Sequence, residues 1–264
     1  MAYQFLIEET DADGVRSVTL NRPDKYNSWH EEMRAEMRDA FARAAVDPVL
    51  RALIVTGAGG KSFSAGEDVG GMKDLTEIGT RGFRAIVRSF HDVFDTIESM
   101  EIPVIAAIEG VAAGGGFEMA LSCDFRVLAE NAMLVMPEAK VGLIPGSGGC
   151  SRLVRHLGLG RAKELVMLGG RMGAGEAREL GLATRVVSPG KAMEGAREIA
   201  RELSKFAPLA IGMAKLVLNS CTDVDQETGR RLERLGQSVL KMTEDHKEGP
   251  RAFLEKRPPQ WKAR

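Results

Sequence analysis

The chain has 264 residues, of which 44% are apolar and 28% charged, a balance typical of a globular domain and unlike that of disordered, collagen-like or coiled-coil proteins. Its 36 Lys and Arg residues nearly cancel its 37 Asp and Glu residues, so the net charge of -1 gives no general attraction to nucleic acid or to an anionic membrane. Three scattered cysteines and four histidines without ligand spacing argue against a disulfide framework and against a metal site.

The opening residues 1–14 contain neither a basic segment nor an apolar core of the kind found in signal peptides. No uncharged run approaches the roughly 18 residues that a membrane span requires. We therefore expect a cytoplasmic protein with reduced thiols that does not act in a membrane.

The first third of the chain predicts two short strands, a helix and a buried strand. The strands span residues 3–8 and 15–20. Ser28 could cap the helix, because Glu31 stands three positions later and apolar residues then recur at helical spacing until Asp47. Residues 52–56 form a near-continuous apolar run, which suits a strand buried on both faces of a parallel sheet.

The same pattern of apolar strand, glycine loop and amphipathic helix then recurs. A Gly-rich loop at 57–71 precedes a helix at about 81–100, and a second buried strand spans 103–108. A helix begins around the glycines at 114–116, and residues 125–128 predict a third strand. This recurrence indicates a layered α/β architecture, with ligands gathered at the loops beyond the strand ends.

After Pro189 the sequence predicts only helices. They cover residues 192–218 with a break at Pro208, then 225–245, and a short last helix that carries 253–257. Such a segment cannot form a core alone, so it must pack on the α/β part or on another subunit. We expect an α/β core over 1–198 and a C-terminal helical segment over 199–264.

Glycines and a carboxylate coincide at the start of the helix that follows the second buried strand. Gly114, Gly115 and Gly116 leave unpaired N–H groups at the positive end of the helix dipole, where an anion or a carbonyl oxygen that gains negative charge would bind. Isolated glycines of this kind could merely allow tight packing. Glu118 changes the balance, because it stands one turn further along the same face.

A second loop could supply another backbone donor. Ala65 and Gly66 follow the first buried strand, and a small residue beside a glycine permits N–H donation to a ligand. Asp68 could cap the segment that follows. Two donors from separate loops at the ends of adjacent strands could form an oxyanion hole.

A third loop holds a carboxylate among apolar residues. Most glutamates are solvated surface groups. Glu138, however, stands near Met136, Val141, Leu143 and Ile144. Desolvation by such neighbours would raise its pKa towards that of a useful proton donor.

Taken together and in this order, these segments resemble the crotonase family (the enoyl-CoA hydratase/isomerase family) over nearly the whole chain. The matching pieces are Asn21-Arg22-Pro23 with Lys25 and Asn27, the loop from Phe63 to Asp68, Pro103 to Gly110 leading into Gly114 to Gly116, Pro137-Glu138 with Gly142 and Pro145-Gly146, Ala174 to Leu182, and Phe253 to Arg257. The resemblance implies an α/β fold built as a spiral of repeated ββα units with a C-terminal helical oligomerisation segment.

The resemblance also implies an enzyme that adds water to a 2-enoyl-CoA, with CoA as part of the substrate and no further cofactor or metal. Glu118 would help to hold and deprotonate water, Glu138 would protonate the α-carbon, and the backbone N–H groups of Ala65 and Gly115 would bind the thioester oxygen. The residues that the resemblance implies for substrate or CoA binding are Lys25, Ala65, Gly66, Asp68, Gly115, Gly146, Phe253 and Lys256. Relatives form trimers or dimers of trimers, so the resemblance implies a homo-oligomer in which the C-terminal segment reaches a neighbour's CoA.

One position departs from the pattern, and several alternatives remain open. Glu67 stands where many relatives carry a small residue; its carboxylate could alter substrate choice or point to solvent, and we favour solvent.

A Δ3,Δ2-enoyl-CoA isomerase needs only one carboxylate, and other relatives perform hydrolysis, decarboxylation or aromatic-acid chemistry. An RNA-binding relative is disfavoured by the charge balance. Candidates for the acyl pocket are Val69, Met72, Leu75, Ile78, Phe83 and Phe90.

Overall fold

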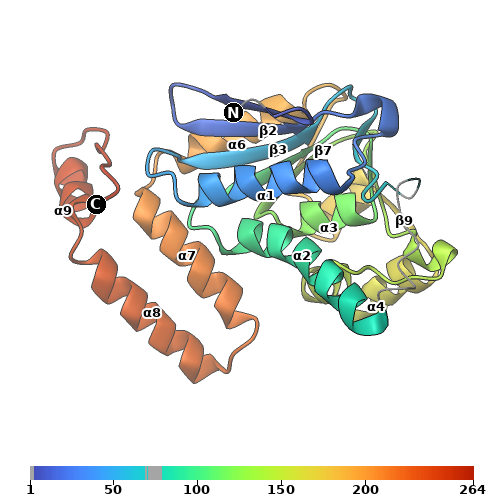
Figure 1. The fold of residues 1–264 in the computed structure, drawn as a ribbon. Helices are drawn as coiled ribbons and strands as arrows, with labels where there is room; N and C mark the ends of the chain where they lie inside the picture. The colour runs from blue at the N-terminus through green and yellow to red at the C-terminus, as the bar shows by residue number, and fades with distance from the viewer. Residues whose placement is uncertain (1–2, 69, 71–78) are drawn as a thin grey trace.

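The computed structural model describes residues 3–68, 70 and 79–264. Its centre is a six-stranded sheet, part of which is visible in Figure 1. In sheet order the strands are β1 (Leu6–Thr10), β2 (Val15–Leu20), β3 (Ala52–Gly57), β5 (Val104–Ile108), β7 (Phe125–Ala129) and β10 (Arg185–Val187). The β1–β2 pair is antiparallel and every other pair is parallel. β5 is buried along its whole length, as its unbroken apolar sequence predicted.

A second sheet of four very short strands lies beyond the ends of the first. It contains β4 (Ser62–Ser64), β6 (Val111–Ala113), β8 (Met133–Val135) and β9 (Arg171–Gly173), in that order. β4, β6 and β8 each follow a strand of the large sheet after a short turn and pair in parallel with one another. A long strand, a short strand and a helical segment therefore recur along the chain, which confirms the predicted spiral of ββα units.

Helices cover the sheets and carry the loops of the site (Figure 1). Their bounds are η1 (Pro23–Lys25), α1 (Glu31–Ala45), α2 (Gly79–Ser99), α3 (Gly115–Ser122), η4 (Glu138–Val141), α4 (Gly149–Met167) and α5 (Ala174–Glu179). The prediction that Ser28 caps α1 is wrong. An isolated β-bridge between Trp29 and Glu67 keeps the chain extended past Ser28, and the His30 side chain then accepts the bond from the Met33 N–H.

The C-terminal helices are α6 (Ala192–Leu203), α7 (Pro208–Cys221), α8 (Gln226–Leu240) and α9 (Glu244–Leu254). α6 packs on β3, β5 and β7 of the large sheet, so residue 198 lies inside a helix of the core. The helix predicted over 225–245 ends at Leu240, because Thr243 caps a separate helix, and that last helix ends at Leu254 before Arg257. α7 is bound to the body through the buried Lys215, which pairs with Asp124, and in Figure 1 α8 and α9 extend beyond it. Within the described ranges, no helix is long and apolar enough to cross a membrane.

Candidate active site

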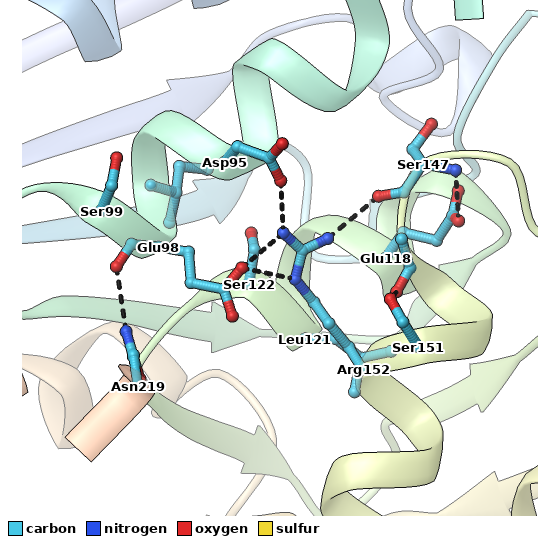
Figure 2. Close-up of polar contacts among 12 residues, drawn as sticks. Asp95, Glu98, Ser99, Glu118, Leu121, Ser122, Ser147, Ser151, Arg152 and Asn219 are labelled. Atoms are coloured by element: carbon cyan, nitrogen blue, oxygen red, sulfur yellow. Dashed lines mark hydrogen bonds and ion pairs between the residues drawn. The ribbon is translucent and has the colours of Figure 1, made fainter. Parts of the chain in front are cut away.

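Glu118 lies in the first turn of α3 and is 3% exposed. Its Oε1 atom accepts bonds from the Ser147 N–H at 2.8 Å and the Gly149 N–H at 2.9 Å, at the start of α4 (Figure 2). Burial raises the pKa of Glu118, whereas these two bonds and the positive charge of Arg152 oppose the rise. No described residue donates a hydrogen bond to Oε2, so this oxygen is available to a ligand or a water molecule.

Glu138, the first residue of η4, faces the same helix start. A Cβ atom on Gly114 would lie 3.0 Å from Glu138 Oε1, so this carboxylate packs against the residue that precedes α3. The Oε2 atom is buried and has no hydrogen-bond partner within the described chain. Burial, with a smaller contribution from the Glu118 charge, raises the pKa of Glu138 to about 7. Two carboxylates with unlike surroundings thus meet at the N-terminus of α3.

The apolar shell predicted around Glu138 is only partly present. Met136 is fully buried. Val141, the last residue of η4, and Leu143 and Ile144, which follow it, are between 45% and 72% exposed in the single chain. The backbone at Gly114 lies against this carboxylate and contributes to its burial in one subunit.

The backbone donors are arranged differently from the prediction. The Ala65 N–H donates to Tyr26 O at 2.9 Å, so the prediction that it binds a thioester oxygen is wrong for this geometry. The next amide that donates to no acceptor in the described residues is that of Glu67. Gly66 packs tightly on Gly115, since a Cβ on Gly66 would lie 2.7 Å from Gly115 N. The Gly115 N–H likewise has no acceptor in the part of the chain that the structure describes. The N–H groups of Glu67 and Gly115 thus lie on either side of one close backbone contact and can bind an oxyanion together.

The Glu67 carboxylate does not point freely to solvent, contrary to the expectation. It forms an ion pair with the guanidinium of Arg34, which is buried on α1 and also pairs with Glu31. The Arg34 guanidinium lies 4.1 Å from the centre of the Phe90 ring on α2. Glu67, the residue that departs from the family pattern, thus binds the arginine that joins α1 to α2.

Lys25 and Asp68 lie near the Gly66 turn. Asp68 pairs with Arg22 at 3.1 Å, and this contact holds the pKa of the carboxyl below its ordinary value. Its other oxygen accepts the Gly70 N–H at 3.2 Å, as expected for a residue that caps the following segment. Lys25, at the end of η1, is exposed and adds positive charge beside Asp68.

The remaining predicted residues divide between the site and the far end of the molecule. Gly146 immediately precedes Ser147, and its carbonyl contacts the His91 ring. Phe253 is 83% exposed in α9, and Lys256 follows that helix with a left-handed φ of 53°. In Figure 1 α9 and α4 lie on opposite sides of the molecule. The structure therefore does not bring Phe253 and Lys256 to the site of their own subunit.

The acyl-pocket prediction is only partly covered by the structure. Val69, Met72, Leu75 and Ile78 lie outside the described residues. Phe83 is exposed on α2, and Phe90 packs under Arg34. Among the residues the structure describes, no group of three or more His, Cys, Asp or Glu side chains is placed to hold a metal ion.

Sequence reasoning missed the residues that support Glu118. Ser147 and Gly149 bind its carboxylate through backbone N–H groups, which no side-chain pattern reveals. Arg152 contacts the Ser147 carbonyl from α4. The available signal was the Gly148-Gly149 pair at a helix start, the same feature that drew attention to the glycines of α3.

Comparison with known proteins agrees with this geometry. Residues 10–264 match the family model described as enoyl-CoA hydratase/isomerase. The chain is 43% identical to a carnitinyl-CoA dehydratase of Salmonella typhi over 259 residues, 95% of each chain. An enoyl-CoA hydratase from Bacillus anthracis superposes with a TM-score of 0.93 at 36% identity and covers 99% of this chain and 100% of its own; DspI from Pseudomonas aeruginosa gives 0.91 at 33%, covering 98% and 97%. The chain therefore belongs to the enoyl-CoA hydratase/isomerase family, the crotonase family, and is an enzyme of its hydro-lyase type.

Proposed function

We propose that the enzyme adds water across the 2,3 double bond of a 2-enoyl-CoA and, in reverse, removes water from a 3-hydroxyacyl-CoA. The observation that carries the proposal is the pair Glu118 and Glu138 beside two N–H groups without an acceptor in the described residues, that of Gly115 at the start of α3 and that of Glu67 in the loop after β4. Hydration needs a base for water, an acid for the α-carbon and a site for negative charge on the thioester oxygen.

The oxygen of the thioester would accept hydrogen bonds from the N–H groups of Glu67 and Gly115. Conjugation makes the β-carbon electrophilic only if negative charge can accumulate on that oxygen. Two preorganised donors and the positive end of α3 provide this stabilisation, and loss of one such donor typically costs ~2.7–4 kcal/mol in the transition state. Trp29 supports the arrangement, because a Cβ on Gly115 would lie 2.6 Å from its ring.

The two carboxylates would have different roles because their surroundings differ. Glu118 is held through Oε1 by two N–H donors that favour the ionised form, which leaves Oε2 to accept a proton from water. Glu138 lacks a donor on its buried oxygen and has a pKa of about 7, so it can carry the proton that reaches the α-carbon. CoA enters as part of the substrate, and the proposal requires no other cofactor.

An isomerase is the principal alternative within the family. Moving a double bond from the 3 to the 2 position needs one carboxylate that shuttles a proton, and Glu138 alone would suffice. The second carboxylate favours hydration, since Glu118 is held at the start of α3 with one oxygen bound by two backbone donors and the other without a donor among the described residues, and isomerisation does not require such a group. A family member that only binds RNA would have no use for either carboxylate.

A panel of CoA esters tests the proposal. The panel contains straight-chain 2-enoyl-CoA esters of increasing length and, because of the similarity to carnitinyl-CoA dehydratase, carnitinyl-CoA assayed for dehydration. We expect loss of the conjugated-thioester absorbance with at least one 2-enoyl-CoA, or its appearance from carnitinyl-CoA. No change with any ester, at enzyme concentrations that bind CoA, would contradict the proposal.

We further propose a homotrimer or a dimer of trimers, in which α9 of one subunit lies near the CoA site of another. Phe253 and Leu254 are more than three-quarters exposed in the single chain, an arrangement typical of a surface that another subunit covers. Lys256 could then contact the CoA phosphates of a neighbour. Sedimentation equilibrium should give three or six times the mass of the 28.6 kDa chain, and a monomer at all working concentrations would contradict this.

A further inference from the structure

Arg152, in the first turn of α4, is 4% exposed and has a partner for each of its guanidinium nitrogens. Nη1 donates to Ser147 O at 3.0 Å. Nη2 donates to Asp95 at 2.8 Å and to Glu98 at 2.6 Å, while Nε donates to Glu98 at 3.1 Å (Figure 2). A planar guanidinium can make these bonds in several directions at once, which a lysine ammonium on a flexible stem cannot reproduce.

Ser147 stands between Arg152 and Glu118. Its N–H donates to Glu118 Oε1 and its carbonyl accepts from Arg152, so both polar groups of one residue are fixed from opposite sides (Figure 2). The neighbouring Gly148 has a φ of 95°, and a Cβ there would lie 2.0 Å from Arg152 Nη1. The guanidinium can therefore occupy this position only because residue 148 is glycine.

The other side of the guanidinium is held by α2. Asp95 and Glu98 both come from that helix, and the Glu98 carbonyl accepts a bond from the Asn219 side chain of α7 at 3.1 Å. Figure 2 shows these contacts as one chain that leads from α7 through α2 and Arg152 to Glu118. Arg152 is thus anchored independently of the loop whose carbonyl it binds.

We propose that Arg152 is a positioning residue that fixes Ser147 so that its N–H stays directed at Glu118 Oε1 and leaves Oε2 facing the water. The inference rests on the proposed hydration reaction, and it assigns Arg152 no contact with substrate. Without the guanidinium, the 146–149 segment can rotate, Glu118 loses an oriented donor, and its carboxylate is no longer held in the ionised, aligned state.

The charges around Glu118 set the expected direction of its pKa in a variant. Arg152 on α4 and His91 on α2 lower the pKa of Glu118, while burial raises it, and Glu138 on η4 is the nearby negative group. Loss of Arg152 removes a positive charge and loosens one of two backbone bonds. Both changes raise the pKa of Glu118, so a base that must be ionised becomes active only at higher pH.

The test compares Arg152→Gln with Arg155→Gln. Arg155 lies on the same helix and is also bound to Glu98, but it contacts Asp223 instead of the Ser147 carbonyl. We expect Arg152→Gln to lower kcat for hydration about 10²-fold, the scale of a misaligned catalytic group, with little change in KM. The acidic limb of its pH–kcat profile should move to higher pH, Arg152→Lys should restore only part of kcat, and Arg155→Gln should behave like the parent.

A second measurement works without turnover. Carbon-13 NMR of labelled glutamate carboxyls follows the Glu118 signal, assigned by its absence in Glu118→Gln, and we expect Arg152→Gln to raise its titration midpoint. If Arg152→Gln does not fold, Arg152→Lys, which keeps a positive charge but cannot bind Ser147 and Glu98 in the same way, should give a smaller shift in the same direction. An unmoved midpoint, or equal effects of the 152 and 155 variants, would overturn the inference. Failure of the parent to hydrate any ester would instead overturn the proposed function, and the NMR result would still decide the role of Arg152.

Discussion

Glu118→Gln and Glu138→Gln are each expected to lower the turnover number for 2-enoyl-CoA hydration by at least ~10²-fold, the usual scale of general acid–base catalysis. Glutamine keeps the size of the side chain, and at position 118 its oxygen can still accept the bonds from Ser147 and Gly149. It can neither take a proton from water nor carry one to the α-carbon. Because both carboxylates act in one reaction, the double variant should fall well short of the product of the two single effects. Steady-state assays by loss of thioester absorbance measure these changes.

The pH dependence separates the two roles. For hydration Glu138 must be protonated, so activity of the parent should decline as pH rises through about 7, and dehydration, which needs the ionised form, should rise over the same range. Residual hydration by Glu138→Gln should lose this alkaline decline. The pH profiles of hydration and dehydration should therefore change in opposite senses near pH 7, because Glu138 acts as an acid in one reaction and as a base in the other.

The outcome for Glu118 distinguishes a hydratase from an isomerase. Acyl-CoA affinity should change little in either variant, because the proposed oxyanion donors are backbone groups. Glu179→Gln, on the exposed face of α5, is the control for loss of a carboxylate elsewhere. Near-parental hydration by Glu118→Gln, together with loss of double-bond migration in Glu138→Gln, would contradict the two-carboxylate account.

The second large effect is expected at Gly66. An added Cβ there would lie 2.7 Å from Gly115 N and 3.0 Å from Ala113 O, so Gly66→Ala must push apart the two segments that carry the oxyanion donors. We expect a loss of about 10² to 10³ in kcat, as when an oxyanion-hole donor is removed. Single-turnover absorbance measurements on the best 2-enoyl-CoA report this loss directly.

Gly60→Ala is the matched control for that variant. Gly60 also has a left-handed φ, of 68°, but no atom lies within 4 Å of a Cβ built there. Both substitutions carry a similar backbone penalty of roughly 1–2 kcal/mol, and only one disturbs the donors. A fall in kcat of the same size in both variants would show that strain, and not the geometry of Glu67 and Gly115, causes the effect.

The sequence allowed the long buried strands and both carboxylates to be predicted. β5 is a continuous apolar run and β3 is apolar from Ala52 to Val55, a pattern typical of strands that are buried on both faces of a parallel sheet. The second sheet was missed because strands of three residues, such as β6, are too short for a period of two to be seen. The glycines before Glu118 marked the correct helix end because unpaired N–H groups are a local property of that end.

The parts that failed depend on contacts between distant segments. The Ala65 N–H is not free, because it donates to the Tyr26 carbonyl at the end of η1. The residues around position 65 give no indication of this contact. The ion pair between Glu67 and Arg34 of α1 also joins segments that are distant in the sequence, so it could not be predicted from the residues around Glu67. Arg152 was overlooked because an arginine on a helix is usually exposed, and only the packing of α2 against α4 shows that this one is buried.

The most direct test of the central claim is the source of the atoms in the product. The parent enzyme is incubated with its best 2-enoyl-CoA in water enriched in oxygen-18 and, separately, in deuterium oxide, and the CoA esters are analysed by mass spectrometry. We predict a 3-hydroxyacyl-CoA with oxygen-18 on the β-carbon and one deuterium on the α-carbon. Deuterium without oxygen-18, in an ester of unchanged elemental composition, would mean that the enzyme moves protons but does not add water, and would contradict the proposed function.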